Sequence, residues 1–147
     1  MIEIFEKGDP ITQEDLKQLE RQLNIAIPEP YRTFLLENNG GRPEPNGIDI
    51  EGLAGEETDI AWFKAVIDLE ESNTIESTIA ILREGYPHKK VLPIARNSSG
   101  DIFCLDLEEG KGFPVVYFEW GGAWQDVPYE PLHVAPDFEA FLGLIHE

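Results

Sequence analysis

The chain has 147 residues and a mass of 16.6 kDa, which suffices for one ordinary domain and leaves no room for a second. Hydrophobic residues make up 41% of it and aromatic residues 10%, so the composition predicts a packed core and argues against intrinsic disorder. The 29 acidic residues against 11 Lys and Arg give a net charge of −18, which argues against direct nucleic-acid binding because phosphates would be repelled.

The first predicted helix begins after Thr12. Threonine is a favoured N-cap residue, and the acids Glu14 and Asp15 suit the positive end of the helix dipole. An apolar stripe with spacings of three and four follows, made of Leu16, Leu19 and Leu23. The pattern predicts an amphipathic helix that ends before Pro28.

A second helix is predicted directly afterwards. Pro30 suits its first turn, and the sequence Asn39-Gly40-Gly41 is typical of a helix end. Its apolar stripe consists of Tyr31, Phe34 and Leu35. We expect these three side chains to lie in the core.

The middle of the chain combines turn-forming residues with two apolar segments. Residues 48–50 predict a short strand, whereas residues 60–63 fit either a helix or a strand. Residues 74–84 predict a third helix, with Gly85 as its stop. The side chains expected on its buried face are Ile75, Ile79 and Leu82.

Residues 91–119 predict an antiparallel meander. Strands at 91–95, 102–107 and 115–119 are separated by turns at 96–101 and 109–112. Pro93 cannot donate a ladder hydrogen bond, so its strand should lie at a sheet edge or contain a bulge. In the first turn we expect Gly100 at positive φ and Asp101 bonded to turn amides.

A last helix is predicted from Pro136 and Asp137. Its apolar residues recur with helical spacing at Phe138, Phe141, Leu142 and Ile145. The order of elements indicates an α+β fold, a single domain over residues 1–147 in which helices pack on a mainly antiparallel sheet.

Several of these segments together resemble the SUKH immunity-protein superfamily, which includes the fungal Smi/Knr cell-wall regulators. The matching segments are residues 27–31, 34–35, 38–41, 92–95, 99–101, 103–106, 116–118, 120 and 138–142, preceded by the leucine-rich first helix. The resemblance implies an α+β fold without known enzymatic activity. In bacteria it also implies a frequent role as the immunity partner of a polymorphic toxin, many of which are nucleases.

The residues themselves offer little catalytic or metal-binding chemistry. Cys104 alternates with apolar residues in a predicted strand, so it is expected to be buried and inert. The three histidines, His88, His133 and His146, lack helical metal-ligand spacing. Adjacent acids could suggest a glycosidase, but such pairs are expected by chance among 29 acids. We therefore predict no enzyme activity, no metal and no cofactor.

The charge is unevenly distributed along the chain. Residues 44–84 contain 11 acids and 2 bases, and residues 97–147 contain 10 acids and 1 base, so each block has a net charge of −9. Such a surface can simply promote solubility or can dock a cationic protein. The residues predicted to bind a partner are Glu56, Glu57, Asp59, Trp62, Asp68, Glu70 and Glu71. Trp62 and Trp124 fit interface anchors and packing equally well, and Trp120 favours packing.

Three functions follow from these observations. The first is a non-enzymatic protein that neutralises a cognate toxin, a basic nuclease, by direct binding. The second is a regulatory scaffold that binds a cellular partner without a toxin, and the third is a hydrolase using buried acids. The acidic N-terminal segment lacks a signal-peptide pattern, no apolar run is long enough to span a bilayer, and the lone cysteine suits a reducing compartment. These features predict a soluble, cytoplasmic protein.

Overall fold

Antiparallel strands, four of the five from the second half of the chain, form the central sheet of the protein. The computed structural model describes all residues except 1, 54, 67–73, 86–89 and 120–130. Its largest sheet has the strand order β5-β6-β7-β8-β9. The bounds are β5 (Trp62–Phe63), β6 (Val91–Arg96), β7 (Ile102–Asp106), β8 (Val115–Phe118) and β9 (Leu132–Ala135). The predicted meander is thus confirmed, and of the ambiguous segment at residues 60–63 only Trp62 and Phe63 form a strand.

Pro93 lies in an internal strand rather than at a sheet edge. Strand β6 pairs with β5 on one side and β7 on the other. The register of the β6–β7 ladder shifts between Pro93 and Ala95, which marks a bulge or similar irregularity. This irregularity accommodates Pro93, which cannot donate to the ladder. Of the two expected arrangements, an edge strand or a bulge, the strand therefore has the second.

Helices form at the predicted places, with some different ends. They are α1 (Gln13–Leu23), α2 (Tyr31–Glu37), α3 (Ile75–Gly85) and α4 (Phe138–Leu144). Thr12 and Asp15 form a reciprocal capping box at the start of α1. The helix ends at Asn24, in the left-handed conformation with φ 54°, several residues before Pro28. Asp137 caps α4 by accepting a hydrogen bond from the Ala140 amide at 2.8 Å.

Two small antiparallel sheets flank the central one. Strand β1 (Glu3–Phe5) pairs with β2 (Arg42–Glu44), and β3 (Gly47–Asp49) pairs with β4 (Glu57–Asp59). Gly41 joins β2 to β5 through a bridge to Phe63. Its φ is 128°, and a Cβ built there would lie 2.6 Å from Ile4 Cγ2, so only glycine fits.

The core contains two clusters of buried side chains. The larger cluster combines apolar residues of all four helices named above with one face of the sheet. Tyr31 and Leu35 are buried in it, as predicted, whereas Phe34 is partly buried and packs with ring-centroid distances of 4.9 Å to Phe63 and 5.0 Å to Phe138. The smaller cluster consists of Leu82, Val91, Ile102, Cys104, Val116 and Phe118. Cys104 is therefore buried, as expected.

The β6–β7 turn differs from the prediction in one respect. Gly100 has the expected positive φ of 92°. The side chain that accepts from the turn amides is Asn97, however, whose Oδ1 lies 3.0 Å from the Ser99 nitrogen and 2.8 Å from the Asp101 nitrogen. Asp101 accepts instead from the Asn97 side chain and the Tyr117 hydroxyl. The buried side chain of Asn97 can bond to groups on both sides of the turn because Asn97 follows directly on β6.

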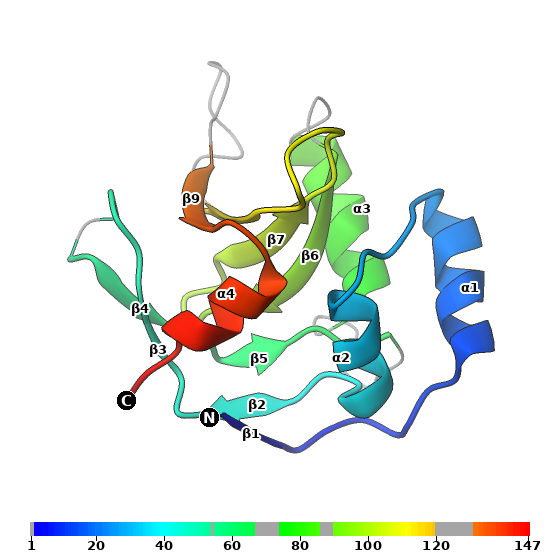
Figure 1. Ribbon diagram of the computed structural model, residues 1–147, viewed down its shortest axis with the longest axis horizontal. Coiled ribbons are helices and arrows are strands. Elements are labelled where there is room, and N and C mark those ends of the chain that lie inside the picture. Colours follow the sequence, from blue (N-terminus) through cyan, green and yellow to red (C-terminus); the bar gives the residue numbers. More distant parts are fainter. Residues whose placement is uncertain (1, 54, 67–73, 86–89, 120–130) are drawn as a thin grey trace.

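The elements are arranged so that α1 and the β3–β4 hairpin lie at opposite ends of the long axis (Figure 1). Helix α2 lies next to α1, and α4 crosses in front of the sheet. None of the helices in the described part of the chain is long and apolar enough to cross a membrane. The architecture confirms the predicted α+β class.

Candidate protein-binding surface

The β3–β4 hairpin and its connection contain Glu56, Glu57 and Asp59, three of the acids predicted to bind a partner. In its ladder Ile48 faces Thr58 and Asp49 faces Glu57. Ile48 is fully buried, while Asp49 and Glu57, on the other face, are exposed. Short backbone hydrogen bonds tighten the connection, including Ile50 N to Glu56 O at 2.6 Å. The hairpin thus anchors one face in the core and projects carboxylates from the other.

Three acids lie at or near the hairpin connection, and only Glu57 has a charged neighbour of opposite sign among the described residues, His146. The side chains of Glu51, Glu56 and Glu57 are exposed and make no hydrogen bond or ion pair with any described residue. Exposed carboxylates on one hairpin create a local negative potential, which attracts a cationic surface. This is the strongest feature of the surface as a binding site.

Asp59 has a structural partner in addition to any binding role. Its carboxylate accepts from the Ser98 amide at 3.0 Å and from the Ser98 hydroxyl. Thr58, next to it, accepts from the Asn97 side chain at 3.0 Å. These bonds fasten β4 to the β6–β7 turn, so the end of the hairpin near Asp59 is held while the connection at Glu56 is exposed.

Trp62 is partly buried and lies among cations. The Arg42 guanidinium is 5.6 Å from its ring centroid, and Arg42 also pairs with Glu6 at 3.1 Å. Arg96 is directly opposite Trp62 in the β5–β6 ladder. Burial lowers the pKa of Arg96, as does Arg42, whereas the nearby Asp59 raises it. Trp62 therefore neighbours two arginines, and only part of its side chain is exposed.

Other predicted residues lie outside the described part of the chain. These are Asp68, Glu70 and Glu71, together with Trp120, Trp124 and His88. The structure also adds Asp49 and Glu51 to the acidic hairpin, which the sequence analysis did not select. The alternation of Asp49 between the buried residues Ile48 and Ile50 is the signal that could have placed it on the exposed face.

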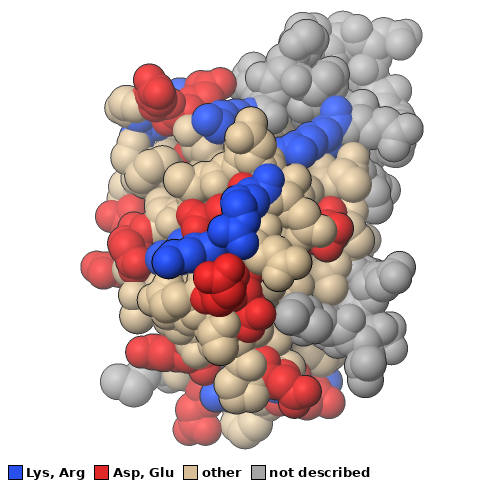
Figure 2. Space-filling view, turned by 90° about the vertical axis from the view of Figure 1, so that its right-hand side faces the viewer, with Lys and Arg blue, Asp and Glu red and all other residues tan. Residues whose placement is uncertain are grey.

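The opposite end of the molecule has a different charge pattern. Figure 2 shows a diagonal row of basic side chains across the side that faces right in Figure 1, with acids beside it. On α1 and α2, Arg21 pairs with Glu14 at 3.1 Å and Arg32 with Glu20 at 2.8 Å. Positive and negative groups there compensate one another at short range.

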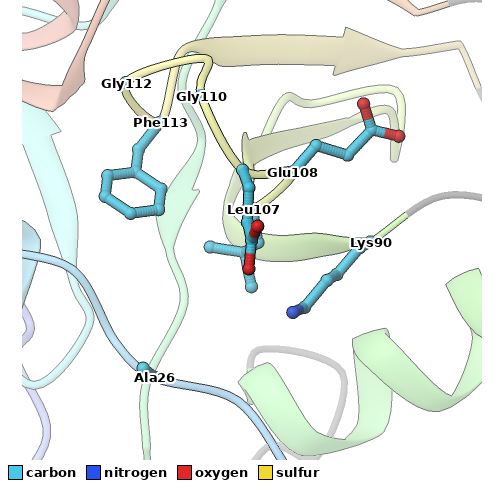
Figure 3. A pocket seen from close by; sticks show the side chains of 8 residues that line it. Ala26, Lys90, Leu107, Glu108, Gly110, Gly112 and Phe113 are labelled. Carbon is cyan, nitrogen blue, oxygen red and sulfur yellow. The ribbon is translucent and has the colours of Figure 1, made fainter.

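A shallow pocket of about 350 Å³ lies between the α1–α2 connection and the β7–β8 turn. Figure 3 shows Leu107 between Phe113 and Lys90, with Ala26 below and Glu108 pointing away. Phe113 is 41% exposed. The lining combines apolar side chains with the Lys90 amine and the carboxylates of Glu108 and Glu109, and it contains no nucleophile paired with a base.

The buried titratable groups do not form a catalytic set in the described residues. Burial raises the pKa of the Cys104 thiol well above its usual range, so the reactive thiolate is suppressed. Burial lowers the pKa of Lys64 to about 8, with a further lowering by Arg96 and an opposing effect of Cys104. The remaining cluster of metal-ligand type is Asp49, Glu57 and His146, on the acidic hairpin.

One comparison with known proteins finds a family. A family model described as the SMI1 / KNR4 family (SUKH-1) matches residues 10–143, which is nearly the whole chain. The match includes α1, α2 and α3, all but the last residue of α4, and all strands except β1. No curated protein matches the chain.

Proposed function

The chain belongs to the SMI1 / KNR4 family (SUKH-1), and from this membership we propose that it is an immunity protein that neutralises a cognate polymorphic toxin by direct binding. The family supports an immunity-like protein-binding role in general and is generally non-catalytic. The finer parts of the proposal are that the toxin is a basic nuclease, that the protein acts in the cytoplasm, and that it has no enzyme activity of its own.

The observation that supports a basic partner is the exposed negative charge of the β3–β4 hairpin. Glu51, Glu56 and Glu57 project from a connection whose backbone is tied by hydrogen bonds. A nuclease must offer cations to the phosphates of its substrate. Carboxylates held at fixed positions can occupy the same cations, which would block access of nucleic acid to the toxin.

The predicted contact residues have different roles within this proposal. Glu56 and Glu57 attract the toxin at long range, and Asp59 positions the hairpin through Ser98. Trp62 contributes desolvated contact with the exposed part of its ring. Asp68, Glu70 and Glu71 follow in the chain and stay a prediction, because they lie outside the described residues.

Binding kinetics with the toxin encoded beside this protein's gene test the proposal. The double variant Glu56→Gln/Glu57→Gln should lower the association rate and flatten its salt dependence, because exposed charges are screened over about 8 Å at physiological ionic strength. Trp62→Ala should mainly raise the dissociation rate, by about 2 kcal/mol if the ring is a hot spot.

A matched control distinguishes the effect of this surface from the effect of the protein's total charge. Glu3→Gln/Glu37→Gln removes the same charge from two exposed acids outside the hairpin and should change association much less. Equal effects of the two double variants would show that the hairpin is not the binding surface. A gene neighbourhood without a toxin, or a neighbouring toxin that does not bind, would contradict the immunity role and favour a regulatory scaffold.

A further inference from the structure

Strand β4 contains no apolar side chain. Its three residues are Glu57, Thr58 and Asp59, and Thr58 is opposite the buried Ile48 on the side of the hairpin that faces the core. Burial of apolar surface therefore cannot hold β4 directly. Two of its side chains form hydrogen bonds with the β6–β7 turn instead, Thr58 with Asn97 and Asp59 with Ser98. The position of the β4 carboxylates thus depends on polar contacts.

The partner of Thr58 is a buried amide whose hydrogen-bonding capacity is fully used. Asn97 is 2% exposed, and its Oδ1 accepts from the Ser99 and Asp101 amides at 3.0 and 2.8 Å. Its Nδ2 lies 3.0 Å from both Thr58 Oγ1 and Tyr117 Oη, with Asp101 Oδ2 at 3.3 Å. An amide group has two acceptor lone pairs and two donor hydrogens, so these contacts fix the orientation of the Asn97 side chain.

Tyr117 on β8 supplies the hydroxyl next to this amide. Its side chain is buried, and burial together with the Asp101 carboxylate raises the pKa of the hydroxyl, which therefore keeps its proton. A carboxylate only accepts, so Tyr117 donates its hydrogen to Asp101 and its oxygen accepts from Asn97. The hydrogen bonds from β8 through Asn97 to Thr58 therefore have defined directions and connect the central sheet to the hairpin.

We propose that the hydroxyls of Thr58 and Tyr117, joined by the Asn97 amide, are positioning groups that hold the β3–β4 hairpin where it meets its partner. Ser98 adds a second attachment through Asp59, so two adjacent residues of β4 are tied to the same turn. A surface that is ordered before contact loses less conformational entropy on binding. The effect on toxin binding rests on the proposed function, whereas the positioning is a property of the free protein.

Amide hydrogen exchange of the free protein tests the positioning. Tyr117→Phe removes one hydroxyl and keeps the ring, whose centroid lies 5.1 Å from that of Phe103, and Thr58→Val removes the other and keeps the branched shape. Each variant should raise the exchange rates of the hairpin amides at 47–49 and 57–59 about tenfold relative to those of α1, because a bond that holds the hairpin is lost. Thr58→Ser keeps the hydroxyl and should exchange like the wild type.

The matched control is Tyr31→Phe, which removes a buried hydroxyl that bonds to none of the described residues. It should leave hairpin exchange unchanged. An equal increase in Tyr31→Phe and Tyr117→Phe, or an increase in α1 as large as in the hairpin, would overturn the proposal, because either result would indicate a general loss of stability. Hairpin exchange at the wild-type rate in both Tyr117→Phe and Thr58→Val would overturn it as well.

Binding to the toxin encoded beside this protein's gene tests the consequence for recognition. Tyr117→Phe changes no charge, so the salt dependence of association should stay that of the wild type, unlike that of Glu56→Gln/Glu57→Gln. Its Kd should rise about 2- to 10-fold, because the hairpin must then be ordered on binding. An unchanged Kd in a variant with faster hairpin exchange would overturn the role of these hydroxyls in recognition. A wild-type protein that binds no toxin would instead contradict the proposed function, and hydrogen exchange would still decide the positioning.

Discussion

Acids at the helical end of the molecule bond within the fold, whereas Glu51 and Glu56, in the connection of the β3–β4 hairpin, are exposed to solvent. Asp15 completes the cap at Thr12, and Glu14 pairs with Arg21. On the hairpin, Glu51 and Glu56 make no hydrogen bond or ion pair with the described part of the protein. Acids at one end therefore have bonding partners within the fold, whereas Glu51 and Glu56 have none among the described residues.

The largest effect should come from the aromatic packing beneath the helical end. Phe34→Ala removes ring contacts with Phe63 and Phe138. Truncations of this kind in a core cost about 2–5 kcal/mol, and partial burial of Phe34 places it toward the lower part of that range. Urea unfolding followed by circular dichroism measures the loss. An unchanged transition midpoint would contradict the role of this side chain in the core.

Glu20 should give the next largest effect. Its carboxylate accepts from the Ile27 amide and from Arg32 Nη1, both at 2.8 Å, and joins the end of α1 to the start of α2. Removal of a partner from a part-buried hydrogen bond costs about 1–3 kcal/mol, so Glu20→Ala should lower the free energy of unfolding by that amount. The exposed Glu37→Gln serves as control and should have little effect. Similar losses in both variants would remove the distinction between partnered and exposed acids.

The contribution of Glu20 also depends on pH. Burial alone would raise the pKa of this carboxyl, but the Ile27 amide and the Arg32 guanidinium outweigh it and hold the pKa below the ordinary value of 4.5. A depressed folded-state pKa gives stability that is present above pH 4.5 and lost as the pH falls through the folded-state pKa. The difference in unfolding free energy between wild type and Glu20→Gln should shrink over that acid range.

The cap of α1 should give a smaller effect. Thr12→Ala removes the hydroxyl that accepts from the Asp15 amide at 3.2 Å. Loss of an N-cap costs typically about 1 kcal/mol, and Thr12→Ser should recover most of it because serine caps equally well. Thermal melts of the two variants decide the point, and equal destabilisation by both would contradict capping as the cause.

The smallest effect on stability should come from the hairpin. Glu56→Gln/Glu57→Gln removes two exposed charges without a hydrogen-bond partner in the described residues, so the free energy of unfolding should change by less than about 0.5 kcal/mol per site. Relief of repulsion between Glu57 and Asp49 favours a slight gain. Marked destabilisation would show that these acids support the fold.

The sequence by itself determined the elements whose signals are local. The cap at Thr12, the stripe at Leu16, Leu19 and Leu23, and the alternation of β7 depend on neighbours a few residues apart, and all are present. Positive φ at Gly100 was equally predictable because few other residues adopt it. Resemblance over many short segments also identified the family.

Only the tertiary structure decided what depends on long-range pairing. Strands β1, β2 and β4 have three residues each, too few for a periodic signal, and they form because a partner strand satisfies their backbone groups. The same pairing sets Asp49 opposite Glu57 and places His146 beside both. It also places Arg42 against the Trp62 ring and Arg96 opposite Trp62 in the ladder. Which acids are compensated is a property of these contacts, because the energy of a charge depends on what lies within a few ångströms of it and not on its neighbours in the chain.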